Sequence, residues 1–408
     1  MLTDSPTLKD TNDKSLVDGK KITLSRNISD AYVRARSFFT DNSFIVKVYL
    51  LSRIFILLVA YVNTILQHSN LASELSNWDG VWYIRLASRG YLHHPVHFQT
   101  TLGFFPFYSM VMWALARVLA GNLLISGLTI NFIGGFVSSV LLFKLMQNWT
   151  NDTAARRAVV VYNLFPGTVI FSMVYSEGIT IPLVMGCILL VQKRRYIAAG
   201  ILAFFATATA PDALALTPVL FVAFLYELKR YEKSLRKASQ AFIGTLLSLG
   251  GIASFGIFLW IWTGTPLASY DAQRYGWKET TTPLALYYQG KILAHEVSFS
   301  HFRFSSINLN YVVALLGALY LVVFLYHIIR PKLYISIPAL VWTLGISFFA
   351  LTSAKTPPNP RLLLTAFPLL IVAAYKFSTR AYRIYLSVAV LLLVYMSSVT
   401  FVGIALRP

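Results

Sequence analysis

Acidic side chains are scarce beyond residue 45, so the candidates for a general base or a carboxylate metal ligand form a short set. Glu227 and Glu232 lie in a basic stretch, where surface ion pairs account for them. Glu279 and Glu296 lie in polar sequence without further chemical context. The ten acidic residues of this region are Glu74, Asp79, Asp152, Glu177, Asp212, Glu227, Glu232, Asp271, Glu279 and Glu296.

Asp79 has the strongest chemical pattern around it, in the segment NWDGVWYIRLASRGY (77–91). The tryptophans, including Trp78, suit a membrane interface, and the apolar spacing predicts a helix lying along it. Arg85 and Arg89 are four residues apart and share one face of that helix. A carboxylate beside cations that bind phosphate is what sugar transfer from a lipid phosphate donor needs. The alternative is that Asp79 only caps the helix.

Two further charges lie at apolar positions. Glu177 lies within a long apolar run, where a charge is costly enough to require a function or a cationic partner. Arg361 opens an apolar segment, and it either snorkels to the interface or clamps a donor phosphate. Arg274 is a third candidate for binding phosphate.

The composition predicts a membrane protein. Hydrophobic residues make up 56% of the 408 residues and charged residues only 12%, against about 25% charged in soluble domains. The net charge of +19 favours cytoplasmic loops facing anionic lipid over nucleic-acid binding, because the basic residues cluster between apolar runs. The single Cys187 excludes a disulfide framework and a cysteine-based metal site.

Two missing motifs narrow the chemistry. The sequence contains no D-x-D pair and no G-x-x-x-x-G-K-[ST] loop. A lipid phosphate donor is therefore favoured over a sugar nucleotide held through a metal, and ATP-driven transport is disfavoured. We expect no metal site and no cofactor.

The chain divides into a polar tail and an apolar remainder. Residues 1–45 are predicted to be a cytoplasmic, mostly disordered tail with a short surface helix near 28–40. The region 46–408 is predicted to be an all-α transmembrane catalytic domain. Its clear apolar spans are 46–66, 102–120, 124–147, 239–262, 309–328, 333–353, 362–378 and 384–406.

The block 158–227 is apolar throughout but interrupted at Pro166, at Lys193 and at Pro211, so it holds two to four crossings or broken helices. Counting basic residues puts the tail, the loop 228–238, the turn around Arg330 and the segment 376–383 in the cytoplasm. The outward loops are then 67–101, 263–308 and 354–361. We predict about eleven spans, with Arg156 and Arg157 exceptionally outside.

Five segments together resemble one family. WDG-x-WY-x-x-x-A-x-x-GY at 78–91, GFFPFY at 103–108, NLFPGTVIFSMVYSEG at 163–178, ATATAP at 206–211 and NPRLLLTAFPLL at 359–370 occur in the order seen in the PIG-V family. That family comprises GPI mannosyltransferase 2 and its bacterial relatives, within the GT-C superfamily. The resemblance covers residues 46–406, and the WDG segment is its most diagnostic part.

The resemblance implies a GT-C-like helical bundle with interfacial helices in the first outer loop. It implies inverting transfer of mannose from a polyprenyl (dolichol-type) phosphate mannose to a lipid-linked glycan acceptor on the extracytoplasmic face. In the GPI pathway this reaction adds the second mannose through an α-1,6 bond. Superfamily members place an acidic residue in the first outer loop as catalytic base, and that residue corresponds to Asp79.

One segment departs from the family pattern. Family members commonly carry an arginine after ATAT, whereas this chain has Ala210, Pro211 and Asp212, so the role of that segment is open. The stretch DAQRYGW (271–277) looks more like bacterial members. This favours a bacterial plasma membrane over the endoplasmic reticulum membrane of a eukaryote.

Two other functions are consistent with the sequence. In a transporter or flippase of a lipid-linked sugar, Glu177 and Asp212 are intramembrane coupling groups. A non-catalytic subunit of a membrane complex is the second, because a family fold does not guarantee a working site. Whether the enzyme needs an accessory membrane subunit is open at this point.

Overall fold

The structure is a computed structural model, and it describes residues 42–230, 235–296, 309–329, 335–354 and 358–402. The predicted tail and its surface helix near 28–40 lie outside the described residues. The chain falls into two units, residues 1–47 and 48–408. The first unit contributes the opening turn of one helix, and the second contains the rest of the described fold.

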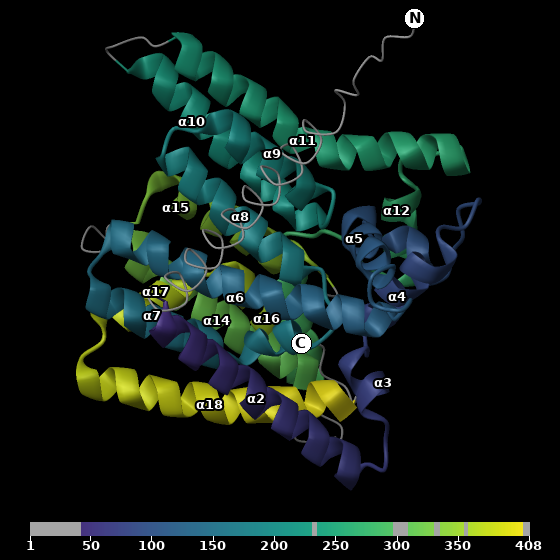
Figure 1. Cartoon of the computed structure of the whole chain (residues 1–408), viewed down its shortest axis with the longest axis horizontal. Helices are drawn as coiled ribbons and strands as arrows, with labels where there is room; N and C mark the ends of the chain where they lie inside the picture. The colour runs from purple at the N-terminus through teal and green to yellow at the C-terminus, as the bar shows by residue number, and fades with distance from the viewer. Residues whose placement is uncertain (1–41, 231–234, 297–308, 330–334, 355–357, 403–408) are drawn as a thin grey trace, which may run out of the picture. The chain divides into compact units, whose positions relative to one another are not determined.

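The described part of the chain is helical, apart from an isolated bridge between Thr281 and Ser353 (Figure 1). This confirms the predicted all-α class. The helices of the first half are α2 (Ser43–Leu66), α3 (Leu71–Leu75), α4 (Asp79–Arg89), η1 (Thr101–Gly103), α5 (Pro106–Ala116), α6 (Leu123–Trp149), α7 (Asp152–Leu164), η2 (Pro166–Ser172), α8 (Glu177–Gln192) and α9 (Tyr196–Thr207). Those of the second half are η3 (Pro211–Ala215), α10 (Leu216–Lys229), α11 (Leu235–Thr263), α12 (Ala268–Asp271), η4 (Ala272–Gly276), α13 (Ala285–Glu296), α14 (Leu309–Ile329), α15 (Ile337–Thr352), α16 (Pro360–Thr365), α17 (Pro368–Lys376) and α18 (Thr379–Val402).

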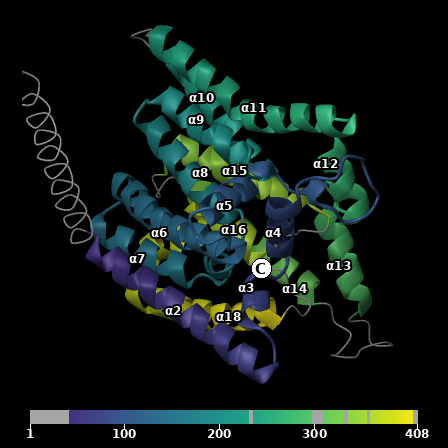
Figure 2. The ribbon, with the colours of Figure 1, turned by 45° about the vertical axis from the view of Figure 1, so that its right-hand side comes forward.

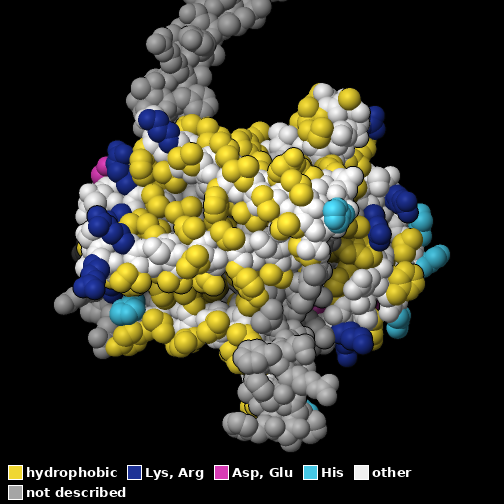
Figure 3. Space-filling model, turned by 90° about the horizontal axis from the view of Figure 1, so that it is seen from below, with side chains coloured by type: hydrophobic (Ala, Val, Ile, Leu, Met, Phe, Trp, Pro, Cys, Tyr) yellow, Lys and Arg dark blue, Asp and Glu magenta, His cyan; other side chains and the backbone are white. Residues whose placement is uncertain are grey.

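Six described helices are long and apolar enough to cross a membrane, and a seventh crossing follows if the bent pair η2 and α8 counts as one span. The two members of that pair meet at 112°. One face of the molecule shows a broad apolar band between two edges where basic side chains gather, with histidines prominent at one of them (Figure 3). The chain is therefore a multi-pass membrane protein, and the count of eleven spans stays a prediction.

Three predicted spans are shorter or broken in the structure. The segment 102–120 contains the eleven-residue α5, which reaches only about 16 Å along its axis, roughly half of the hydrocarbon thickness. The segment 333–353 forms the sixteen-residue α15. The segment 362–378 is split into α16 and α17, each of which begins at a proline. Proline at the first helical position starts a new helix where apolar composition alone predicts continuity.

The basic segments gather at one end of the helices. Arg157 donates to the carbonyl of Phe377 and the hydroxyl of Thr379, at the start of α18. Arg194 pairs with Glu227 at 2.6 Å, and Lys237 donates to the Arg194 carbonyl. Arg157 therefore lies on the same side as the segment 376–383, so the prediction that Arg156 and Arg157 lie outside and the prediction that 376–383 is cytoplasmic cannot both hold. With them on this end, the charges follow the positive-inside rule.

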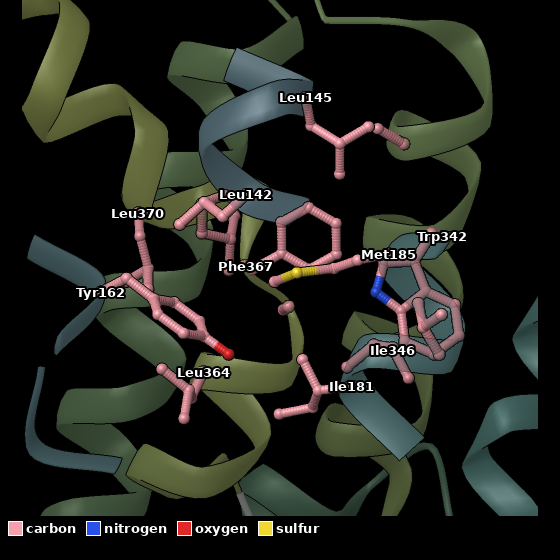
Figure 4. Packing of buried hydrophobic residues seen from close by; sticks show 14 of the residues in the cluster. Leu142, Leu145, Tyr162, Ile181, Met185, Trp342, Ile346, Leu364, Phe367 and Leu370 are labelled. Carbon is pink, nitrogen blue, oxygen red and sulfur yellow. The ribbon is translucent and has the colours of Figure 1, made fainter. Parts of the chain in front are cut away.

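The core packs α6, α7, α8, α15, α16 and α17 together (Figure 4). Figure 4 shows Leu142, Tyr162, Met185 and Trp342, from α6, α7, α8 and α15, converging with Phe367 from the turn between α16 and α17. The helices α6 and α8 approach closely because Gly134 faces Gly178. A Cβ at Gly134 would lie 1.7 Å from the Gly178 carbonyl oxygen. Small residues thus bring helix backbones together, as is common between membrane helices.

Thiol labelling tests the predicted sidedness, because the single native Cys187 is buried. We expect Ser88→Cys, on the exposed side of α4, to react with a membrane-impermeant maleimide in intact cells. Ser239→Cys, exposed near the start of α11, should react only after permeabilisation. The unmodified chain is the control. Labelling of Ser239→Cys in intact cells would contradict the topology.

Candidate active site

Asp79, Glu177 and Arg361 meet in one ion cluster. Arg361 Nη1 donates to Asp79 Oδ2 at 2.6 Å, although the two residues are 282 positions apart. Arg361 Nε lies 3.4 Å from Glu177 Oε1. Within the described residues this buried Nε makes no hydrogen bond. The guanidinium therefore lies between two carboxylates, with its Nη1 on Asp79 and its buried Nε towards Glu177.

The three side chains differ in their access to solvent. The Asp79 side chain is 33% exposed, whereas those of Arg361 and Glu177 are 18% and 12% exposed. The guanidinium also lies over the ring of Tyr175, 5.4 Å from its centroid. Asp79 is thus the carboxylate of this pair that a substrate can reach most easily, and Glu177 mainly anchors Arg361 from beneath.

Asp79 is positioned through the start of α4. Trp78, the N-cap residue, has φ +61°, which is rare for a residue with a side chain. The neighbouring α18 holds this conformation, since Trp78 Nε1 donates to the Thr400 carbonyl and Asn77 Nδ2 donates to the Phe401 carbonyl. Strained backbone of this kind persists only where the surroundings determine it, often at functional sites. The helix α3, which precedes this segment, lies against one end of α18 in both ribbon views (Figure 1 and Figure 2).

Arg361 is positioned by a helix cap and a close backbone contact. Asn359 accepts a hydrogen bond from the Leu362 amide, and Pro360 occupies the first helical position of α16. On its other side α16 touches η2 at Gly167. A Cβ at Gly167 would lie 2.1 Å from the Pro360 oxygen and 3.0 Å from the Arg361 nitrogen. The backbone of η2 is thus packed directly beneath the arginine.

Glu177 is the first residue of α8. It follows residues 173–176, where the chain bends away from η2. In this segment the Val174 amide donates to the Leu75 carbonyl, and the Val174 oxygen would lie 3.1 Å from a Cβ at Gly80. Tyr175 lies under Arg361. The run from η2 to Glu177 therefore contacts the elements of both Asp79 and Arg361. The bend between η2 and α8 thus places the Val174 backbone and the Glu177 carboxylate next to the elements that carry Asp79 and Arg361.

Tyr83 lies one turn after Asp79 on α4 and is buried. Burial raises the pKa of its phenol far above the ordinary value, and the carboxylates of Asp79 and Glu177 raise it further. The phenol therefore stays protonated at all physiological pH values. Its ring packs edge-on against Phe104 and Tyr108, which fixes the inner face of α4.

Gly167→Ala tests the close contact between η2 and α16. We expect the free energy of unfolding to fall by about 2 kcal/mol, a typical cost of overpacking, because the added methyl group must push Pro360 away. Thermal unfolding in detergent measures the change. The control is Gly290→Ala on α13, where a Cβ meets nothing within 4 Å. Equal melting temperatures for both variants would contradict the contact.

Three predicted site residues lie apart from the cluster. Arg85 is exposed and stacks on the Trp82 ring at 4.9 Å. Arg89 is exposed in the last turn of α4, about 15 Å along the axis from Asp79. Arg274 lies in η4 over the ring of Tyr275. The structure unites Asp79, Trp78, Glu177 and Arg361, and it leaves these three arginines outside their contacts.

The structure adds Asp212 to the candidate active site, whereas the sequence suggested this residue only as a coupling group of a transporter. Asp212, at the start of η3, interacts electrostatically with both Arg361 and Glu177. Sequence reasoning treated it as a coupling group of a transporter. An acidic residue directly after Pro211 in an apolar block was the available signal. Among the described residues, no group of three or more His, Cys, Asp or Glu side chains is placed to hold a metal ion.

The family comparison covers most of the chain. The model of the family described as mannosyltransferase (PIG-V) matches residues 50–402. The chain belongs to this family. The family predicted from the WDG segment and the four later motifs is thereby confirmed. No curated protein gives a significant match to this PIG-V member.

Solved structures similar to this PIG-V family member are longer proteins. ArnT from Cupriavidus metallidurans bound to undecaprenyl phosphate is 13% identical, covering 82% of this chain and 61% of that chain, with a TM-score of 0.47. The archaeal oligosaccharyltransferase AglB from Archaeoglobus fulgidus, in complex with an inhibitory peptide and a dolichol-phosphate, is 11% identical, covering 91% and 57%, with a TM-score of 0.48. The chain spans about three fifths of the length of these proteins.

Proposed function

We propose that this PIG-V family member transfers mannose from a polyprenyl phosphate mannose to a lipid-linked acceptor on the outer side of the membrane. The observation that carries the proposal is the 2.6 Å pair between Asp79 and Arg361, which joins a reachable carboxylate to a phosphate-binding group. The family's mannosyltransferase activity supports the choice of sugar. The positive-inside pattern supports an outward-facing site.

Asp79 acts as the general base. The acceptor hydroxyl oxygen attacks the anomeric carbon of mannose, and its proton passes to Asp79. The bond between that carbon and the phosphate oxygen breaks, so the electron pair leaves with polyprenyl phosphate. Attack from the face opposite the phosphate inverts the configuration. The 33% exposure of the Asp79 side chain suits direct contact with the acceptor.

Arg361 binds the donor phosphate and stabilises the charge that develops as it leaves. Glu177 holds the guanidinium on its Nε side, with Nε 3.4 Å from Glu177 Oε1, while Nη1 faces the more exposed Asp79. The phosphate competes with Asp79 for the outer edge of the guanidinium. Donor binding therefore releases the carboxylate oxygen that accepts the proton, which couples substrate binding to activation of the base.

Trp78 fixes the direction of the Asp79 side chain through its bond to α18. Arg85, Arg89 and Arg274 lie on the same outer loops at exposed positions, where they suit contacts with lipid headgroups or with the charged acceptor. They are proposed as acceptor-side contacts, while Arg361 handles the donor. We further propose an α-1,6 linkage, like that of the second mannose in the GPI pathway, and a location in a bacterial plasma membrane.

The test uses the purified chain in liposomes with radiolabelled polyprenyl phosphate mannose and lipid extracts as acceptors. Transfer of label to a lipid-linked product supports the proposal, and analysis of that product identifies the acceptor. Label that crosses the bilayer while still attached to its donor, without product, favours the transporter function. In that case Glu177 and Asp212 become the residues to substitute first.

A further inference from the structure

Arg53 is a cation buried inside the membrane domain. It lies in α2 and is 2% exposed. Its guanidinium donates to the Thr168 carbonyl at 2.7 Å, to the Thr168 hydroxyl at 2.9 Å and to the Ser172 hydroxyl at 3.2 Å. These acceptors are neutral. A charge in the apolar interior is costly and usually has a function.

All three of these acceptors belong to η2. This 3₁₀ helix runs for seven residues, all of them buried, whereas 3₁₀ helices seldom exceed about four residues. Phe171 of η2 and Tyr49 of α2 lie beside the guanidinium, with ring centroids 6.0 Å and 5.3 Å away. Arg53 thus fastens η2 to α2 through Thr168, the third residue of η2, and Ser172, its last.

The fastened segment and the residues that follow it contact the elements of the ion cluster at three points. Gly167 packs against Pro360 and the Arg361 amide nitrogen. After η2 the chain passes Val174, which hydrogen-bonds the loop before Asp79, and then reaches Glu177. A shift of η2 therefore moves the supports of Asp79, Glu177 and Arg361 together. Arg53 also donates from its Nε to the hydroxyl of its neighbour Ser52 at 3.3 Å, within α2.

We propose that Arg53 is a positioning residue for the transfer reaction, which fixes η2 against α2 and thereby holds Asp79, Glu177 and Arg361 in the arrangement that the donor meets. This inference rests on the proposed function. Arg53 itself touches neither donor nor acceptor. Its effect on catalysis is indirect and proceeds through the backbone of η2, so both the rate and the local order of this segment depend on it.

The experiment measures kcat, KM for the donor and hydrogen exchange in Arg53→Lys and Arg53→Met. We expect kcat to fall by about tenfold for lysine, which keeps the charge but loses the fork of donors, and by about a hundredfold for methionine. The donor KM should change much less than kcat. Amide exchange should quicken in 165–178 and 359–366 and stay unchanged in α9 and α11.

Arg157→Met is the matched control, because Arg157 also donates to a backbone carbonyl and a threonine hydroxyl, but at the basic end. It should retain kcat. If Arg53→Met does not fold, Thr168→Val and Thr168→Ser replace it. The valine removes one acceptor of Arg53 and should slow transfer, whereas the serine keeps it and should not.

Uniformly faster exchange, or unchanged kcat and unchanged exchange in 165–178, would overturn the positioning role. The exchange measurement does not require activity. If the unmodified chain transfers no mannose, the proposed function fails, and the exchange pattern still decides whether Arg53 orders η2 and the cluster.

Discussion

Replacing Asp79 with asparagine is expected to reduce mannose transfer by about a thousandfold, within the range that general-base catalysis contributes. The amide has nearly the same shape as the carboxylate but cannot take the proton of the acceptor hydroxyl. It also loses the charge that pairs with Arg361 at 2.6 Å. Initial rates with saturating donor and acceptor measure the effect. The donor KM should not rise, because the neutral amide competes more weakly than the carboxylate with the donor phosphate for Arg361.

Asp152→Asn is the matched control for this substitution. Asp152 also pairs with an arginine, Arg156, at 2.7 Å, but the pair is exposed and lies at the basic end. The Arg156 guanidinium lowers the pKa of the Asp152 carboxyl through a hydrogen bond. Breaking an exposed pair costs at most about 1 kcal/mol. We therefore expect normal transfer, and a similar loss in both variants would refute a special role for Asp79.

Glu177→Gln distinguishes the role of Glu177 from that of Asp79, the other carboxylate that holds Arg361. Glu177 is more deeply buried than Asp79 and lies farther from the guanidinium. If Asp79 is the base, the glutamine variant should lose less activity than Asp79→Asn. The reverse order would assign the base to Glu177. The comparison uses the same assay and needs only the relative rates.

The local sequence around Asp79 predicted its helix correctly, and the place of this helix at the membrane interface stays a prediction. Asp79 begins α4, and α4 buries one face while Arg85 and Arg89 stay exposed on another. Tryptophan spacing and helix periodicity are short-range signals, so a single segment is enough to read them. The positive φ of Trp78 was not readable, because it depends on α18, more than three hundred residues later.

The pairing of Asp79 with Arg361 was not readable either. The sequence indicated that Glu177 needs a cationic partner and that Arg361 lies at an outer edge, but many arginines satisfied that description. Arg85 and Arg89 were the nearer choices along the chain. The break between η2 and α8, together with the split at Pro368, determines which arginine reaches the carboxylates. These bends arise from packing among several helices.

Span prediction failed where apolar runs hide helix ends. The run 102–120 is apolar throughout, but Pro106 starts a helix that ends after eleven residues. Arg156 and Arg157 were placed outside because one crossing was counted at 102–120. Composition measures how well a segment tolerates lipid, and it does not say whether the helix is continuous. A correct count of crossings would have needed both the length of α5 and the position of Arg156 and Arg157 relative to the other basic segments.

Arg361→Lys is expected to reduce kcat divided by the donor KM by about a hundredfold, or about 3 kcal/mol of transition-state stabilisation. Lysine keeps the positive charge, so the carboxylates stay compensated and the protein should fold. Its single ammonium cannot bridge Asp79 and Glu177 and also meet a phosphate, as a planar guanidinium with five donors can. We expect a higher donor KM together with a lower kcat. Steady-state kinetics over a range of donor concentrations separates the two.

Arg361→Gln should be more damaging, because it leaves the largely buried Glu177 and the partly exposed Asp79 without their cation. Removing one partner of a buried ion pair typically costs about 3 to 5 kcal/mol, which thermal unfolding in detergent would detect. Arg157→Lys, at the opposite end, is the control and should change neither rate nor stability. If Arg361→Lys lowers kcat but leaves the donor KM unchanged, Arg361 only orients Asp79. The donor phosphate must then bind elsewhere, and Arg85, Arg89 and Arg274 on the outer loops become the candidates.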